Sequence, residues 1–117
     1  MRFEPGDLVL VPFPFSDLSS KKTRPAVVVS SSAYNATGAD IVVCGVTSNL
    51  SPTPHGILIT SKDLVRGTLP ATSQIKVDKL ATLQKTMVRR ILSRLTPATI
   101  RRVRLELQTL LGPWEPT

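Results

Sequence analysis

Residues 24–47, RPAVVVSSSAYNATGADIVVCGVT, contain two short β-branched runs separated by a polar connection. The runs at 25–30 and 40–47 are rich in Val and Ile, which favour β-strands, and each has the length of an ordinary strand. The connection at 31–39 includes Asn35 and Gly38, which are common in turns, and no regular element is predicted there. This stretch therefore predicts two strands of one small sheet.

Further strand-like runs flank this stretch on both sides. Pro5-Gly6 signals a turn into a strand at 7–11, which Pro12 and Pro14 end. The polar residues 16–24 then predict an exposed loop. Beyond residue 47, strands are predicted at 56–60, at 73–83 with a break near Lys79-Leu80, and at 87–95. Between them, residues 62–68 predict a turn or a brief helix ending near Gly67.

The C-terminal segment has the pattern of a helix. Thr96 is a good N-cap, Pro97 suits the first helical position, and Gly112-Pro113 ends the segment. Leu105 is off the apolar stripe, whose members are Ile100, Val103, Leu107, Leu110 and Leu111. Several short strands with one terminal helix indicate an α+β domain with a strongly curved antiparallel sheet.

The composition indicates one small globular domain without a disulfide bond. Of the 117 residues, 41% are hydrophobic, and the single cysteine, Cys44, is interpreted as a small buried residue. No apolar run is long enough to span a bilayer, and a cytoplasmic protein without a membrane partner is predicted. The only histidine, His55, is interpreted as exposed in a Pro-rich loop. No metal-ligand spacing appears, and no metal or other cofactor is expected.

Positive charge is concentrated in the second part of the chain. Residues 1–70 carry six Lys and Arg against five Asp and Glu, whereas residues 71–117 carry nine against three. This basic part either forms a solvated surface or binds a polyanion such as nucleic acid or an acidic protein. The densest basic cluster comprises Arg89, Arg90, Arg94, Arg101, Arg102 and Arg104.

An ordered set of short motifs resembles the MazF/PemK toxin family. Gly6-Asp7 opens the first strand, Arg24-Pro25 starts the second, and Val46-Thr47-Ser48 ends the third. The run SQIKVDKLATL at 73–83 and a helix ending in Leu-Leu-Gly complete the set, which covers residues 5–112. One departure is that Ser19-Ser20-Lys21-Lys22 stands where many relatives carry a Glu.

This resemblance implies an architecture for the whole chain. It implies a single toxin domain at 1–117, with an SH3-like, CcdB/MazF-like β-barrel at 5–95, a C-terminal helix at 96–112 and a tail at 113–117. It further implies a homodimer and a cognate antitoxin that blocks the RNA groove, as in a type II toxin–antitoxin system.

The same resemblance implies an endoribonuclease that cleaves single-stranded RNA, such as mRNA, in a sequence-specific way. The catalytic Arg of the family aligns with Arg24 and its catalytic Thr with Thr47. Attack by the RNA 2′-OH needs no metal if cationic donors are placed where charge develops, and a guanidinium can contact two phosphate oxygens. The candidate RNA-binding residues are Lys21, Lys22, Ser48, Lys76, Asp78, Lys79 and Thr82.

Simpler interpretations of these residues exist. From spacing alone, a surface ion pair with Asp7 or Asp17 is the better interpretation of Arg24, and Thr47 is an ordinary strand-end hydroxyl. Two other functions also fit the sequence. One is a non-catalytic, CcdB-like toxin that acts on a protein target such as DNA gyrase, and the other is a basic nucleic-acid-binding barrel.

Overall fold

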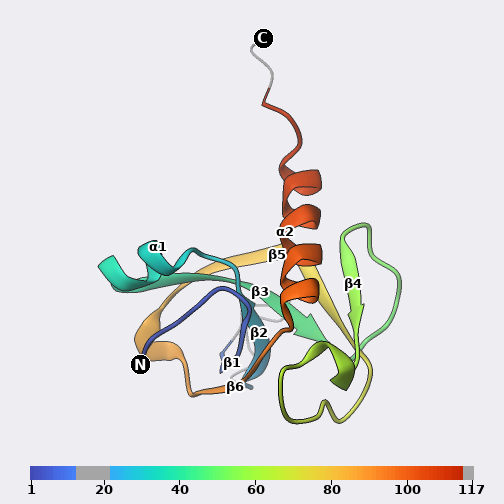
Figure 1. Cartoon of the computed structure of the whole chain (residues 1–117), viewed down its shortest axis with the longest axis horizontal. Helices are drawn as coiled ribbons and strands as arrows, with labels where there is room; N and C mark the ends of the chain where they lie inside the picture. The colour runs from blue at the N-terminus through green and yellow to red at the C-terminus, as the bar shows by residue number, and fades with distance from the viewer. Residues whose placement is uncertain (13–21, 115–117) are drawn as a thin grey trace.

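In a computed structural model, which describes residues 1–12 and 22–114, the chain forms a curled antiparallel sheet with a C-terminal helix (Figure 1). The described part contains six strands in the spatial order β4-β5-β3-β2-β1-β6, and each pairing is antiparallel. The two edge strands do not pair with each other, so the sheet is a half-barrel. The strands are β1 (Asp7–Val11), β2 (Arg24–Val28), β3 (Asp40–Thr47), β4 (Gly56–Ile59), β5 (Ser73–Gln84) and β6 (Arg90–Arg94).

The strand predictions are largely confirmed. The predicted bounds of β1 and β3 agree with the structure, and those of β2 and β4 differ by one or two residues. The predicted strand at 87–95 is shorter than expected, because residues Lys85–Met87 form the 3₁₀ turn η2 before β6 begins. The predicted turn at 62–68 begins with a second 3₁₀ turn, η1 (Ser61–Asp63), and Gly67 has a positive φ of 75°.

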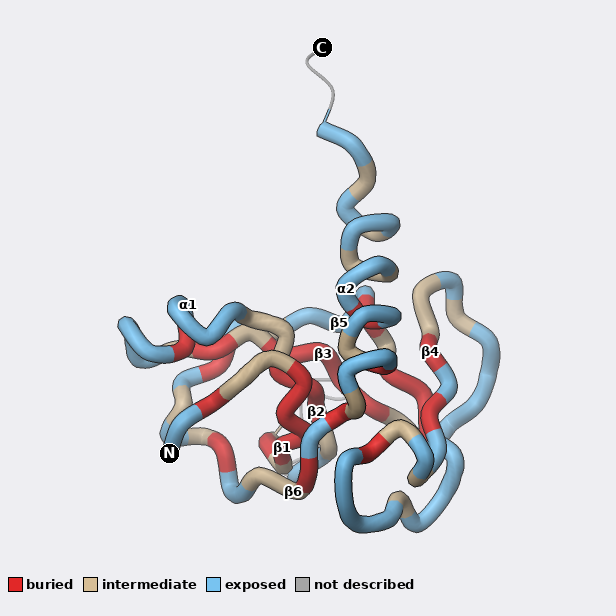
Figure 2. Tube along the Cα trace, in the orientation of Figure 1, coloured by how far each residue is buried: buried red, intermediate tan, exposed pale blue. Residues whose placement is uncertain are grey.

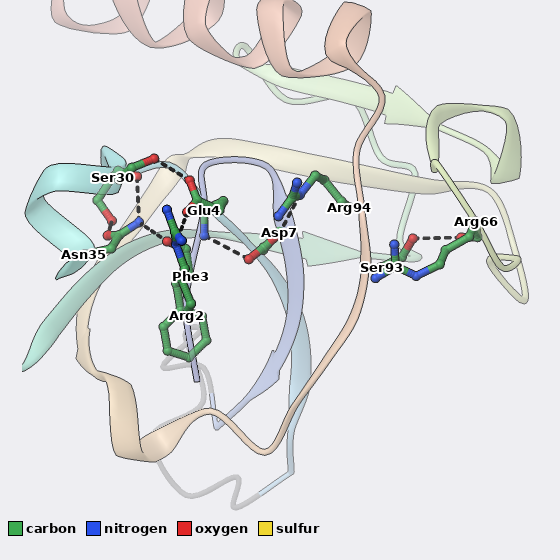
Figure 3. A network of polar contacts seen from close by, with 10 residues as sticks. Arg2, Phe3, Glu4, Asp7, Ser30, Asn35, Arg66, Ser93 and Arg94 are labelled. Carbon is green, nitrogen blue, oxygen red and sulfur yellow. Dashed lines mark hydrogen bonds and ion pairs between the residues drawn. The ribbon is translucent and has the colours of Figure 1, made fainter.

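The connection at 31–39 contains a short helix that the sequence did not predict, α1 (Ser32–Thr37). The Ser31 hydroxyl caps it by accepting a hydrogen bond from the Tyr34 amide. Buried Asn35 anchors it, because its Nδ2 donates to the backbone oxygens of Phe3 and Ser30 (Figure 3). These tertiary contacts stabilise a helix of six residues that has no apolar stripe.

The sheet buries apolar side chains on both faces, as the buried stretches of the central strands show (Figure 2). One group, the helix-facing cluster, packs with Val103 of α2 (Pro97–Leu111). The other group, the opposite-face cluster, is closed by Phe3 and Val88. Along β2 and β3 successive side chains alternate between these two clusters. The helix-facing cluster contains Val27, Cys44 and Val46. The opposite-face cluster contains Ala26, Val28, Ile41 and Val43.

Strand β5 changes faces in its middle. Lys76 pairs with Gly45 and Leu80 pairs with Cys44, so Val77, Asp78 and Lys79 have no partner on β3. Ile75 and Val77 belong to the helix-facing cluster, whereas Leu83 belongs to the opposite-face cluster. The strand is therefore continuous, but it carries a wide irregularity at the place where a break was predicted.

Helix α2 is fixed to the sheet at its N-terminal end. Its N-cap Thr96 accepts from the Thr99 amide, and the Thr99 hydroxyl donates to Asp63 Oδ1 at 2.7 Å. Farther along the helix, Leu105 and Leu111 are exposed, so the apolar stripe does not stay in contact with the sheet as far as Leu111. The C-terminal half of α2 projects from the body of the molecule (Figure 1). Among the described residues, no helix is long and apolar enough to cross a membrane.

Candidate functional site

Arg24 and Thr47 lie at the same level of neighbouring strands. Arg24 begins β2 and Thr47 ends β3, and the pairing of the two strands ends at Ala26 and Gly45. Extending this register by two residues puts Arg24 in line with Thr47. By strand alternation both residues are on the face of Ala26 and Val43, the face of the opposite-face cluster, and Arg24 is exposed.

The Thr47 hydroxyl is oriented by the residues that follow it. Its Oγ1 accepts a hydrogen bond from the Asn49 amide at 3.1 Å. A hydroxyl has one hydrogen to donate and two lone pairs to accept with. Because one lone pair is used by Asn49, the hydroxyl hydrogen is directed away from that amide. Thr47 can therefore donate to an anionic oxygen placed beside it.

Buried Gln74, which lies in the run SQIKVDKLATL but was not among the candidate site residues, fixes the loop after Thr47. It pairs with Thr47 across the sheet, its Nε2 donates to the backbone oxygens of Asn49 and Ser51, and its Oε1 accepts from the Thr53 hydroxyl. Gly56 leaves room for this amide, since a Cβ there would lie 1.9 Å from Gln74 Oε1. The strand's alternation puts Gln74 on the same polar side as Lys76, so nothing in the sequence indicated that it is buried.

Lys76 joins Arg24 and Thr47 on the same face. It pairs with Gly45, which is two residues from Thr47 and therefore on the Thr47 face of β3. Its side chain is half-buried. Asp78 and Lys79 follow in the irregular part of β5, and both are exposed. Two cations and one hydroxyl thus gather on three adjacent strands, with a carboxylate close along β5.

The other predicted RNA-binding residues are more dispersed. Ser48 follows Thr47 and is exposed, and Lys22 is exposed two residues before Arg24. Thr82 pairs with Val42, whose neighbours Ile41 and Val43 belong to the opposite-face cluster, so Thr82 is on the other face from Arg24 and farther along the sheet. Lys21, like Asp17 and most of the predicted loop at 16–24, lies outside the described residues.

Asp7, one suggested partner of Arg24, is engaged by other groups. Its buried carboxylate accepts from Arg94 Nε and from the Glu4 amide, both at 2.9 Å (Figure 3). Asp7 is also four residues along β1 from Val11, the residue that pairs with Arg24. The Arg94–Asp7 pair ties β6 to β1 and belongs to the framework of the barrel.

His55 is not the exposed loop residue that the sequence suggested. Its side chain is half-buried, and its Nδ1 lies 2.8 Å from Glu106 Oε1 on α2. The two residues are 51 positions apart in the sequence, so no local pattern could have indicated the pair.

Cys44 is buried, as predicted, and this burial together with the negative charge of Asp78 raises the pKa of its thiol to about 12. A thiol in this state is a poor nucleophile. Within residues 1–12 and 22–114, no three His, Cys, Asp or Glu side chains lie close enough together to share a metal ion.

A curled six-stranded antiparallel half-barrel with a helix after the last strand, carrying Arg, Thr and Lys on adjacent strands, defines a class of small α+β proteins. The sequence matches the model of PemK-like, MazF-like toxins of type II toxin–antitoxin systems over residues 4–111. The chain therefore belongs to this toxin family, as its motif order suggested.

Curated relatives and solved structures agree with this assignment. Endoribonuclease MazF4 of Mycobacterium tuberculosis is 30% identical over 92 residues, which are 78% of this chain and 82% of the relative. An endoribonuclease of a mycobacterial species, solved in complex with its cognate antitoxin, superposes with a TM-score of 0.74 at 27% identity, covering 97% of this chain and 98% of that one. A MazE–MazF structure from Deinococcus radiodurans has a TM-score of 0.77 at 25% identity, covering 96% and 98%.

Proposed function

We propose that this toxin is an endoribonuclease that cleaves single-stranded RNA without a metal ion, in the cytoplasm where mRNA is found. The observation that supports this proposal is that strand register and alternation put Arg24 and Thr47 on one face of two neighbouring strands, with Lys76 on the same face of the next strand. The family relatives named endoribonucleases support the same activity.

In the proposed reaction the RNA supplies its own nucleophile. The 2′-hydroxyl gives up its proton to solvent as its oxygen forms a bond to phosphorus, and the 5′-oxygen takes up a proton from solvent as its bond to phosphorus breaks. The products therefore carry a 2′,3′-cyclic phosphate and a 5′-hydroxyl. Negative charge grows on the non-bridging oxygens in the transition state. The guanidinium of Arg24 can bind two of these oxygens, and the Thr47 hydroxyl can donate to one of them. Lys76 adds a positive charge on the same face.

Incubation of the purified protein with a long single-stranded RNA in excess EDTA tests this activity. We expect discrete fragments with 5′-hydroxyl ends, and end-mapping of the fragments identifies the preferred sequence. Binding without cleavage would instead indicate a nucleic-acid-binding barrel. Inhibition of DNA gyrase without RNA cleavage would indicate the CcdB-like alternative.

We further propose that the toxin forms a homodimer and is inhibited by a cognate antitoxin that contacts the basic outer surface of α2. Arg94 is paired with Asp7, and Arg102 lies 3.9 Å from Asp63, so these two are partly engaged within the chain. Arg101 and Arg104 line a shallow hollow on the helix with Leu105 and Gln108. A surface that combines two guanidinium groups with an exposed leucine suits an acidic, partly apolar segment.

A double variant, Arg101→Ala/Arg104→Ala, tests the antitoxin contact. We expect its affinity for the antitoxin, measured by calorimetry, to fall at least about 10-fold, while RNA cleavage by the free toxin is retained. An unchanged antitoxin affinity would place the contact elsewhere. Sedimentation velocity of the free toxin tests the homodimer.

A further inference from the structure

The hydrogen-bond contact between His55 and Glu106 connects α2 to the strands that carry the candidate site. His55 directly precedes β4, and Glu106 lies in the middle of α2. The side chains of the two residues are only 23% and 30% exposed. Neither residue has a place in the cleavage reaction described above, so the pair needs another explanation.

The backbone beside His55 extends this connection to β5. The His55 carbonyl accepts a hydrogen bond from the Val77 amide at 3.3 Å, and the next residue, Gly56, pairs with Lys76. The two residues His55 and Gly56 therefore contact two consecutive residues of β5. Lys76 belongs to the candidate site, and Val77 begins the irregular segment.

The irregular segment at 77–79 has little other backbone support. Val77, Asp78 and Lys79 have no partner on β3, and the pairing of β5 with β4 covers only Ser73 to Lys76. Backbone that leaves the ladder loses the hydrogen bonds that fix neighbouring strands. The hydrogen bond from Val77 to His55 is thus a local restraint on the segment that presents Lys76 and Asp78.

We propose that His55 is a positioning residue for RNA cleavage, because its contact with Glu106 fixes the segment of β5 that carries Lys76 and Asp78. This inference rests on the proposed endoribonuclease activity. Glu106 fixes the His55 imidazole through their hydrogen-bond contact. The backbone of residues 55–56 in turn contacts Val77 and pairs with Lys76. Small displacements of groups that contact a transition state reduce the rate strongly, whereas one partly exposed side-chain contact contributes little to global stability.

Substitutions at Glu106 test this chain of contacts most directly, because Glu106 lies on the helix and an effect on cleavage has to pass through His55. We expect Glu106→Ala and His55→Ala each to lower kcat about 10-fold with a small change in KM. The double variant should be no slower than either single variant, since all three lack the same contact. Glu106→Gln keeps an oxygen acceptor for the imidazole and should remain within about 2-fold of the original rate.

Thr109→Ala is the matched control on α2. Thr109 is exposed, and its hydroxyl donates to the Leu105 backbone oxygen of its own helix. This variant should cleave RNA at the original rate. A normal rate for Glu106→Ala, or a double variant slowed by the product of the two single effects, would overturn the proposal.

A structural measurement separates this inference from the activity itself. In ¹⁵N-labelled protein without RNA, Glu106→Ala should shift the amide resonance of Val77 and accelerate its exchange with solvent, whereas Thr109→Ala should not. Unaltered Val77 signals in Glu106→Ala would refute the positioning role even if the protein cleaves RNA. Altered Val77 signals in a protein that cleaves no RNA would refute the proposed function, but they would still show that Glu106 affects Val77 through His55.

Discussion

The distinction between Arg24 and the other arginines depends on what lies opposite each side chain. Arg24 begins β2 on the face that carries Thr47, whose hydroxyl accepts from the Asn49 amide, while Arg94 is bound to the buried carboxylate of Asp7. A guanidinium on the same face as a hydroxyl suits a phosphate, whereas the second arginine neutralises a carboxylate inside the barrel. Two arginines at similar strand ends therefore have different chemistry.

Arg24→Ala should abolish most cleavage while the protein remains folded. Loss of one donor that stabilises transition-state charge commonly lowers kcat by about 10²–10³-fold, and we expect a loss in this range. Arg24→Lys keeps the charge but cannot form the two parallel hydrogen bonds, so its rate should be intermediate. Single-turnover cleavage measures both.

Arg66→Ala is the control for these variants, because Arg66 is exposed in the turn after η1, away from β2 and β3. It should leave the rate and the unfolding midpoint unchanged. A rate for Arg24→Ala within a few-fold of the original would remove Arg24 from the mechanism.

Cys44 should be unreactive in the folded protein. Burial raises the pKa of its thiol from about 9 to about 12, so near neutral pH the thiolate is essentially absent. Native protein should resist a disulfide reagent near neutral pH and react with one equivalent after unfolding in urea. Rapid labelling of the native protein would contradict the buried position.

The raised pKa of Cys44 also predicts how stability changes with pH. The folded state favours the protonated thiol, so this contribution is complete below about pH 9, where the unfolded thiol is also protonated. Above that value the unfolded state releases its proton first, and stability falls as pH rises toward about 12. Urea denaturation of the original protein and of Cys44→Ala across this range should show a steeper decline for the original.

At the scale of elements, the sequence predicts most strands and the helix ends but not the course of β5. Ile75, Val77, Ala81 and Leu83 recur at every second position except 79, which is Lys79, and such a pattern is typical of one buried face. The structure assigns Ile75 and Leu83 to different clusters, because three residues lack partners on β3. Pairing register is a property of two strands, and a periodicity within one strand does not contain it.

The candidate site likewise combines residues that the sequence predicts with residues that only the tertiary structure reveals. Family resemblance identified Arg24 and Thr47, and pairing register brought Lys76 to them and left Thr82 on the other face. The positions of the Gln74 and His55 side chains depend on contacts with residues distant in sequence. Helix α1 was missed for a similar reason, since buried Asn35 ties it to Phe3, 32 residues away.

The junction of β1 and α2 depends on Gly6. Its φ of 90° favours glycine, and a Cβ there would lie 2.4 Å from Ile100 Cδ1. Gly6→Ala should therefore lower the free energy of unfolding by roughly 2–4 kcal/mol, through backbone strain and displacement of Ile100. Urea denaturation measures the change.

Gly38→Ala is the matched control, because Gly38 has a φ of −132° and no atom lies within 4 Å of the place that a Cβ would occupy. It should alter the free energy of unfolding by about 0.5 kcal/mol or less. Equal effects of the two substitutions would show that Gly6 is not a structural requirement.

At the scale of the whole molecule, the net charge of +7 favours binding to a polyanion, but it does not locate the contact. The positive charges in the second part of the chain are spread over several elements: Lys76 and Lys79 near the candidate site, Lys85, Arg89, Arg90 and Arg94 in and before β6, and the three arginines of α2. A molecule of this kind can bind RNA and an acidic partner through different groups.

The salt dependence of RNA binding should show whether the two lysines before β2 contact the RNA phosphates. Each phosphate contact contributes a slope of about −0.7 in log K against log salt for single strands. If Lys21 and Lys22 each contact a phosphate, Lys21→Ala/Lys22→Ala should weaken binding and flatten the slope by about 1.4. Fluorescence anisotropy over a salt series measures it, with Lys62→Ala/Arg66→Ala as a charge-matched control. An unchanged slope would exclude both lysines from the RNA contact.

The projecting end of α2 has a consequence for the free toxin in solution. Val103 is buried, whereas Leu111 and Trp114 are exposed, so the last turn has few tertiary contacts to resist fraying. Amide protons should exchange progressively faster from Val103 toward Leu111 in dilute solution. If a second copy covers this end, protection of the last turn from amide exchange should rise with protein concentration. Amide exchange at the helix terminus then measures self-association.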